Sequence, residues 1–225
     1  MTQMQATTRF LPHDLLLLSD PARLIGDTPM PDWAVESLAL APWVVVRRTA
    51  FRDGRIPVGI RGKARDQRWA AWLDPRDLQE RLMPEALPAR LSRLAAGRVA
   101  EVAALAGIEP LAALLVPLGW TWGPTGSVGF ELASCTPTAK QSSDLDAMIR
   151  ADDPIDRGHA AALLTEIARL GLRCDLLLET PAGAVALSEY VRDAGPVVAR
   201  SLDGPHLVAD PWQASTRPER VEVGR

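Results

Sequence analysis

The chain has 225 residues, a formal net charge of −3 at pH 7, and 47% hydrophobic and 24% charged residues. These values are typical of one or two compact domains and exclude a disordered chain. The negative net charge argues against a general nucleic-acid-binding protein, because such proteins face phosphates with many lysines and arginines. No stretch reaches the roughly 18–20 apolar residues that cross a bilayer, and residues 1–10 lack an apolar signal segment, so we expect a cytoplasmic protein without membrane partners. Cys135 and Cys174 lack the spacing of a metal site or disulfide scaffold and are predicted to be free thiols.

The first part of the chain, residues 1–88, is predicted to be a small basic α+β domain. Two β-branched runs, residues 43–46 and 56–60, are separated by an Asp-Gly turn and predict a hairpin. Asp74-Pro75 is typical of a helix start, and leucines spaced four apart predict that this helix continues to Leu82.

The second part, residues 89–213, is predicted to hold a mixed β-sheet flanked by helices, and residues 214–225 are predicted to be a flexible tail. Prolines at 84 and 88 place the domain boundary near residue 88. Periodicity and composition predict strands around residues 145–149 and 172–179, and helices over 89–106, 111–115, 156–170 and 187–191.

Basic residues are concentrated near the predicted hairpin. The segment 47–68 has two acidic residues and eight basic ones: Arg47, Arg48, Arg52, Arg55, Arg61, Lys63, Arg65 and Arg68. Arginine forms paired hydrogen bonds to phosphate or carboxylate, so five arginines are candidates for binding an anionic substrate or an acidic protein: Arg47, Arg48, Arg61, Arg65 and Arg68. An ordinary solvated surface explains them equally well, although glycines on either side favour Arg61. Lys140 is a weaker candidate of the same kind.

Three aspartates predict a metal site. Side chains two apart on a strand share a face, so Asp144 and Asp146 point together while Leu145 points into the core. Two carboxylates so close repel each other unless a cation lies between them, and hard oxygen ligands suit Mg²⁺ or Mn²⁺. Asp175, on the next predicted strand, would be a third carboxylate.

Gly126-Ser127 precedes a predicted helix through Leu132. Backbone amides at a helix N-terminus bind anions, and glycine removes a side chain where a polyphosphate must approach the backbone. An isolated Asp-x-Asp is more often a solvated turn, and Gly-Ser before a helix is more often a simple cap. The combination of Gly-Ser, Asp-x-Asp about 17 residues later and a further strand aspartate is much more specific, and it predicts a metal-dependent nucleotidyltransferase.

Longer segments carry a family resemblance that covers nearly the whole chain. Gly-Ser, Asp-x-Asp and a third strand carboxylate resemble the DNA polymerase β-type nucleotidyltransferase superfamily. More narrowly, the chain resembles malonate decarboxylase holo-acyl-carrier-protein synthases, also called phosphoribosyl-dephospho-CoA transferases. The segments that carry this resemblance are HDLLLL, VVVRR, VGIRGKARDQRWAAW, WGPTGSVGFELAS, SSDLDAMIR and CDLLLETPAGAVALSEY.

The resemblance implies a specific reaction. The family transfers the phosphoribosyl-dephospho-CoA group of 2′-(5″-triphosphoribosyl)-3′-dephospho-CoA to a serine of the malonate decarboxylase acyl carrier protein and releases diphosphate. In that reading Asp144, Asp146 and Asp175 are the catalytic, metal-binding carboxylates, and Gly126 and Ser127 hold the triphosphate. The chain departs from the family pattern at Ser134-Cys135, where the family has Thr-Gly, and at Ala147, where it has Leu. Neither change removes a proposed ligand.

Two other readings remain open on the motifs alone. A nucleotidyltransferase of the same fold could act on another hydroxyl group, for example by adenylylating a small molecule. A chain of this fold could also be an inactive binding module, although three unpaired acids argue against it, because buried carboxylates cost stability unless something compensates them. His13, Glu131 and Glu179 are expected to be mainly structural, and the tryptophans mainly core residues.

Overall fold

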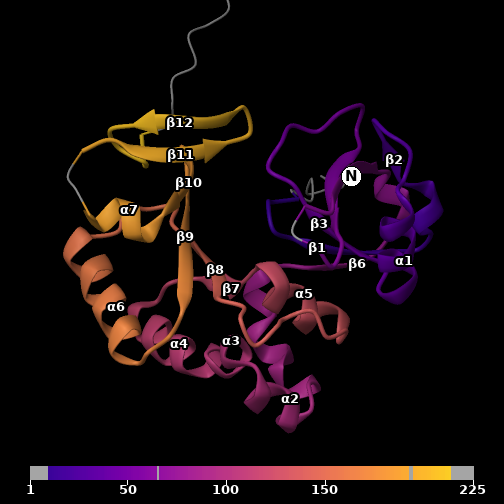
Figure 1. The fold of residues 1–225 in the computed structure, drawn as a ribbon. Helices are drawn as coiled ribbons and strands as arrows, with labels where there is room; N and C mark the ends of the chain where they lie inside the picture. Colours follow the sequence, from indigo (N-terminus) through magenta and orange to yellow (C-terminus); the bar gives the residue numbers. More distant parts are fainter. Residues whose placement is uncertain (1–9, 65, 193–194, 214–225) are drawn as a thin grey trace, which may run out of the picture.

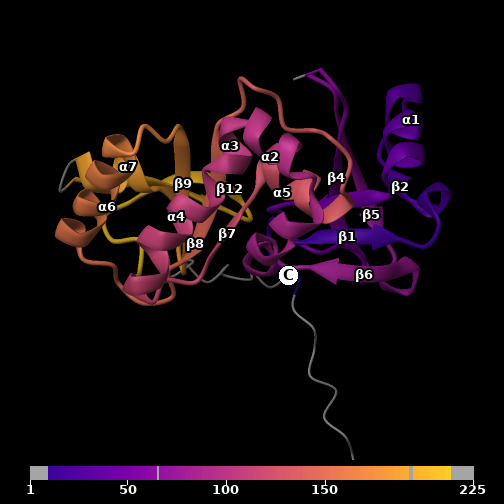
Figure 2. The same ribbon diagram turned by 90° about the horizontal axis from the view of Figure 1, so that it is seen from below.

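The computed structural model describes residues 10–64, 66–192 and 195–213, and they form two six-stranded sheets with helices packed against them (Figures 1 and 2). The expected α+β class is confirmed. Arg65 and the predicted tail, residues 214–225, lie outside the described residues.

The first sheet is antiparallel throughout and has the order β2-β5-β4-β3-β1-β6. Its strands are β1 (Leu15–Leu18), β2 (Ile25–Gly26), β3 (Trp43–Val46), β4 (Ile56–Arg61), β5 (Arg68–Leu73) and β6 (Leu78–Leu82). The predicted hairpin is confirmed, since β3 and β4 pair with Val45 opposite Gly59.

The two faces of this sheet have different partners. Side chains of alternate residues on β4 and β5 pack with Ala34 and Leu38 of α1 (Asp32–Leu40), which covers one face. On the other face, Leu15 and Trp43 belong to a core that continues into the second part of the chain. The two parts therefore share apolar packing.

The predicted helix from Asp74 to Leu82 is wrong. The Asp74 side chain does cap a turn, accepting a hydrogen bond of 3.0 Å from the Arg76 amide, but that turn is a short 3-10 helix, Pro75–Asp77. The chain then becomes β6, which pairs with the free edge of β1. Pairing with an existing sheet edge outweighs a weak local helical pattern.

The predicted helix over residues 89–106 is broken into three pieces. They are a 3-10 helix, Pro88–Arg93, then α2 (Ala96–Glu101) and α3 (Ala103–Ala106). Val102 leaves helical geometry between the last two and is fully buried in the core. Helix α4 (Ile108–Leu115) follows and includes the predicted helical piece 111–115. The other 3-10 turns are Pro21–Arg23, Pro84–Ala86 and Val116–Leu118.

The second sheet is mixed, as predicted, with the order β12-β11-β10-β9-β8-β7. Its strands are β7 (Trp122–Pro124), β8 (Leu145–Arg150), β9 (Cys174–Thr180), β10 (Gly183–Ala186), β11 (Val197–Ser201) and β12 (Gly204–Val208). Only β8 and β9 run parallel, and α6 (Arg157–Arg169) connects them. Helix α5 (Gly126–Ser134) joins β7 to the segment before β8, and α7 (Leu187–Arg192) packs beside β9 and α6.

Two expectations from composition can be checked directly. Cys135 and Cys174 are free thiols. Among the helices of the described residues, none has the length and apolar character needed to span a bilayer.

Candidate active site

Asp146 and Asp175 lie side by side on the two parallel strands. Asp146 on β8 is the register partner of Asp175 on β9, so their side chains project from the same face of the sheet. Asp144 immediately precedes β8. The parallel β8–α6–β9 unit thus brings together the acids that the motif spacing singled out.

The electrostatics of Asp146 reflect this crowding. Burial raises the pKa of Asp146, and the negative charges of Asp175 and Asp144 raise it further. The positive charges of Arg61 and His13 partly offset this effect. A cation among these carboxylates would favour their ionised forms.

Asp144 forms an ion pair with an arginine. Its Oδ1 lies 2.7 Å from Nη2 of Arg173, the residue before β9. Over residues 10–64, 66–192 and 195–213, no group of three or more His, Cys, Asp or Glu side chains is arranged to hold a metal ion. Two neighbouring carboxylates still suit Mg²⁺, which takes one or two protein carboxylates and completes its shell with water and phosphate oxygens.

The N-terminus of α5 is fixed directly beside Asp146. The Thr125 amide donates a 2.8 Å hydrogen bond to the Asp146 carbonyl, and Thr125 makes no side-chain cap to the helix. Gly126 has φ +58°, and a Cβ added there would lie 2.3 Å from Oδ2 of Asp146. The first turn of α5 therefore presents uncapped amides next to a carboxylate that only glycine lets so near.

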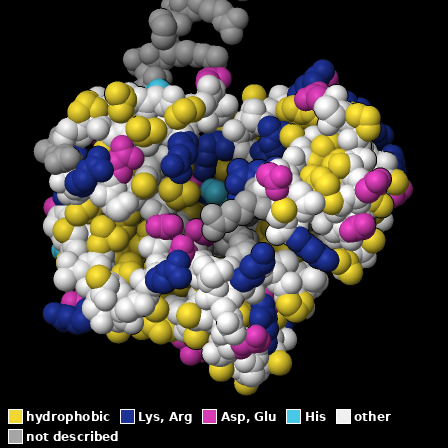
Figure 3. Space-filling model, in the orientation of Figure 1, with side chains coloured by type: hydrophobic (Ala, Val, Ile, Leu, Met, Phe, Trp, Pro, Cys, Tyr) yellow, Lys and Arg dark blue, Asp and Glu magenta, His cyan; other side chains and the backbone are white. Residues whose placement is uncertain are grey.

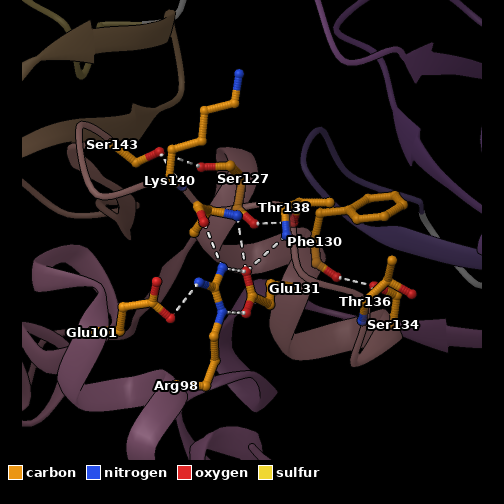
Figure 4. A network of polar contacts seen from close by, with 11 residues as sticks. Arg98, Glu101, Ser127, Phe130, Glu131, Ser134, Thr136, Thr138, Lys140 and Ser143 are labelled. Carbon is orange, nitrogen blue, oxygen red and sulfur yellow. Dashed lines mark hydrogen bonds and ion pairs between the residues drawn. The ribbon is translucent and has the colours of Figure 1, made fainter.

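Ser127 and the loop after α5 complete this side of the site (Figure 4). The Ser127 hydroxyl lies 3.4 Å from the Ser143 hydroxyl, which accepts a 2.9 Å hydrogen bond from the Lys140 amide. The Lys140 side chain is exposed and extends away from this network. Among the described residues its amine forms no ion pair, so it can meet an anion near the N-terminus of α5.

A buried ion pair between Glu131 and Arg98 anchors this loop (Figure 4). Glu131 is 1% exposed and accepts hydrogen bonds from Arg98 Nε at 2.8 Å and from the Thr138 and Ala139 amides at 2.9 and 2.8 Å. Burial alone would raise the pKa of Glu131, but these hydrogen bonds outweigh burial and lower it. The Thr138 hydroxyl in turn donates a 2.9 Å hydrogen bond to the Ser127 carbonyl.

Residues of the first sheet reach the site from the opposite side. Arg61, at the end of β4, and His13, just before β1, are both near enough for their charges to lower the pKa of Asp146. Figure 3 shows a hollow between the two parts of the molecule, bordered by basic side chains, with acidic side chains and a histidine beside it.

Glu179 ties the two parts together at the far end of β9. It is 9% exposed and forms an ion pair with Arg48, and its Oε1 lies 3.3 Å from Nε2 of His13. Burial alone would raise the pKa of Glu179, but hydrogen bonds from His13 and Arg48 outweigh burial and lower it to about 2. His13 has φ +74°, a strained value for a residue with a side chain.

The sequence candidates thus differ in where they lie. Asp144, Asp146, Asp175, Gly126, Ser127 and Arg61 converge, whereas Arg48 is engaged by Glu179 and Arg65 lies outside the described residues. Sequence reasoning missed Arg173 and Arg98, the partners of Asp144 and Glu131. Nothing in the sequence marks these two arginines, because both partnerships form only in the folded chain.

Comparison with known proteins identifies similar sequences over nearly the whole chain. Residues 89–211 match the family model described as phosphoribosyl-dephospho-CoA transferase MdcG C-terminal domain, and residues 11–84 match the corresponding N-terminal domain. A phosphoribosyl-dephospho-CoA transferase of Azotobacter vinelandii is 44% identical over 209 residues, covering 92% of this chain and 97% of that protein. Proteins of the same name from Pseudomonas fluorescens and Pseudomonas aeruginosa are 40% and 41% identical, each over 90% of this chain and over 94% and 93% of their own lengths. No solved structure matches.

Proposed function

The chain belongs to the phosphoribosyl-dephospho-CoA transferase family, and we propose that it transfers this group to a serine of the malonate decarboxylase acyl carrier protein. The donor in this proposal is 2′-(5″-triphosphoribosyl)-3′-dephospho-CoA. The observation that carries the proposal is the pair Asp146 and Asp175 on adjacent strands, beside the uncapped N-terminus of α5.

The proposed reaction is one phosphoryl substitution. The serine Oγ attacks the α-phosphorus of the 5″-triphosphate, and a new P–O bond forms while the bond to the β-phosphate breaks. Diphosphate leaves, and the serine proton passes to a carboxylate of the cluster. Catalysis of such a transfer depends mainly on positioning and on stabilising the negative charge that develops on the phosphate oxygens.

Each part of the site has a role in this reaction. The α5 amides at Gly126 and Ser127 would bind the β- and γ-phosphates, because a helix N-terminus favours anions. Lys140 and Arg61 would add positive charge on opposite sides of the triphosphate. Asp146 and Asp175 would hold Mg²⁺ or Mn²⁺, and Asp144 could join them by exchanging its ion pair with Arg173. Such a bound cation would neutralise charge on the phosphates.

The proposal is tested by incubating the protein with the donor, Mg²⁺ and the apo carrier protein. The carrier should gain the mass of one phosphoribosyl-dephospho-CoA group for each diphosphate released, and a carrier with its acceptor serine replaced by alanine should gain none. Asp146→Asn should lower the rate by at least about 10²–10³-fold, the effect typical of removing a principal electrostatic group.

Asp153→Asn is the matched control, because Asp153 is exposed and has no ion pair among the described residues. This control should retain the rate of the unaltered protein. Absence of a mass gain on the carrier, or an adenylyl mass instead, would refute the proposed reaction.

A further inference from the structure

A pair of arginines lies on the face of the first sheet that α1 does not cover. Arg61 on β4 is the register partner of Arg68 on β5, so the two exposed side chains project together from one face. The buried neighbours Ile60 and Trp69 project to the opposite face, into the core under α1. Like charges directly opposite each other on a sheet destabilise it. In the described part of the chain neither arginine forms a salt bridge, and Arg61 interacts with Asp146 only through its charge.

A third arginine extends the row across the sheet. A Cβ added to Gly59 would lie 3.3 Å from Cγ and Cδ of Arg47, so the Arg47 side chain passes over Gly59 on the same face as Arg61. Gly59 pairs with Ala70, and this pair of small residues is the floor over which the Arg47 side chain lies. We define Arg47, Arg61 and Arg68 with this floor as the arginine face.

The arginine face lies on the side of the first sheet that packs against the second part of the chain. Trp43, on the same face of the sheet as Arg47, packs into the core shared with the second part, and Arg61, beside Arg68, lies near enough for its charge to act on Asp146. A ligand with one anionic group beside the carboxylate site, and a second anionic group farther along the same molecule, would therefore contact both the carboxylate site and the arginine face. An acidic protein could bind the arginine face without contacting the carboxylate site, so the closeness of the two favours a single ligand with two anionic groups.

We propose that the arginine face binds the internal diphosphate of the dephospho-CoA half of the donor. This inference rests on the proposed function, in which the donor carries two separate polyphosphate groups. With the 5″-triphosphate held at α5, the 5′-diphosphate needs a second site, and guanidinium groups bind phosphate oxygens through paired hydrogen bonds. The first sheet is thereby the part of the protein that distinguishes this donor from a simple nucleoside triphosphate.

The test measures the binding affinities of two partial ligands, dephospho-CoA and inorganic triphosphate, in separate isothermal titration calorimetry experiments. Dephospho-CoA carries the diphosphate without the ribosyl triphosphate, and inorganic triphosphate carries only the other group. Arg68→Gln should weaken dephospho-CoA binding about tenfold, or ~1.4 kcal/mol, and leave triphosphate binding unchanged. Arg68→Lys should recover part of the loss, because it restores the charge without the planar fork.

Arg93→Gln is the control, because Arg93 is exposed in the second part of the chain and has no ion pair among the described residues. It should change neither affinity. An equal loss of triphosphate and dephospho-CoA binding in Arg68→Gln would overturn the proposal and show a general attraction for anions. Unchanged dephospho-CoA binding with a raised KM for the carrier protein would also overturn it, and would assign the arginine face to the carrier.

These outcomes are separable from failure of the proposed function, because binding is measured without turnover. A protein that binds dephospho-CoA through Arg68 but never modifies the carrier would refute the transfer reaction alone. A protein that modifies the carrier but binds dephospho-CoA independently of Arg68 would refute the arginine face alone.

Discussion

Gly126 is the residue on which the contact between α5 and β8 depends most directly. Its left-handed backbone, φ +58°, turns the chain into the helix, and its missing side chain leaves the space that Asp146 occupies. Both requirements fall on one position, so glycine there serves conformation and close approach together. The amides of α5 can therefore face the same ligand as the carboxylate.

Replacing Gly126 with alanine should damage both stability and activity. The methyl group would displace Asp146, and the left-handed backbone costs about 1–2 kcal/mol with a Cβ present. Gly97→Ala is a matched control, because a Cβ there meets nothing within 4 Å in an exposed part of α2. We expect Gly126→Ala to lower the transfer rate at least about tenfold and Gly97→Ala to leave it unchanged. Equal rates for the two variants would contradict the role given to Gly126.

Cys135 occupies a position that suits glycine better. It follows α5 with φ +55°, and it is exposed, so its side chain contributes little packing. Cys135→Gly should therefore stabilise the protein by about 0.5–1 kcal/mol, which for a chain of this size raises the Tm by about 1–4 °C. Thermal unfolding checks this, and a lower Tm would show that the thiol makes a contact worth more than the backbone strain.

At the scale of elements, α5 and its following loop are held as one unit by Glu131. This carboxylate accepts hydrogen bonds from Arg98 of α2 and from two loop amides, and the loop carries Lys140 and Ser143 beside Ser127. The buried ion pair thus sets the shape of the loop on the phosphate side of the site. Removing one partner of a buried pair leaves the other uncompensated.

Glu131→Gln should destabilise the protein by about 3 kcal/mol, because its amide group would face donors where an acceptor is required. Denaturant unfolding measures this. Glu101→Gln removes the other, exposed partner of Arg98, which lies 3.4 Å away, and should cost at most about 0.5 kcal/mol. A similar loss in both variants would mean that Glu131 does not organise the loop.

Some of these elements could be predicted from the sequence, and others could not. Strands β8 and β9 and helix α6 follow from strong periodicity and clear end signals, and together they bring Asp146 beside Asp175. Strand β6 could not be predicted, because its local pattern is helical and only the edge of β1 makes it a strand. The ion pairs of Glu131 and Asp144 could not be predicted from the sequence either, because each joins residues that are far apart in the chain or in different elements.

At the scale of the whole molecule, the first sheet acts as one wall of the site. Apolar contacts through Leu15 and Trp43 join it to the second part, and Glu179 adds a polar link to Arg48 and His13. The charge of Arg61, on this wall, acts on Asp146. The geometry of the site therefore depends on how the two parts pack together.

The polar link predicts a specific pH dependence. The pKa of Glu179 falls from its ordinary 4.5 to about 2 on folding, so its contribution to stability is present above pH 4.5 and is lost as the pH falls toward 2. The unfolding free energy of the unaltered protein should exceed that of Glu179→Gln by about 3 kcal/mol at neutral pH. This difference should shrink between pH 4.5 and 2. A difference that stays constant across this range would contradict the prediction.

The central claim is that Asp146 and Asp175 share a divalent cation with the donor phosphates. Electron paramagnetic resonance of Mn²⁺ tests it most directly, because the signal of free Mn²⁺ falls when the ion binds. With the donor present, the unaltered protein and Asp153→Asn should bind Mn²⁺ beyond what the donor binds alone, and Asp146→Asn should not. Equal Mn²⁺ binding by Asp146→Asn and the unaltered protein would contradict the account.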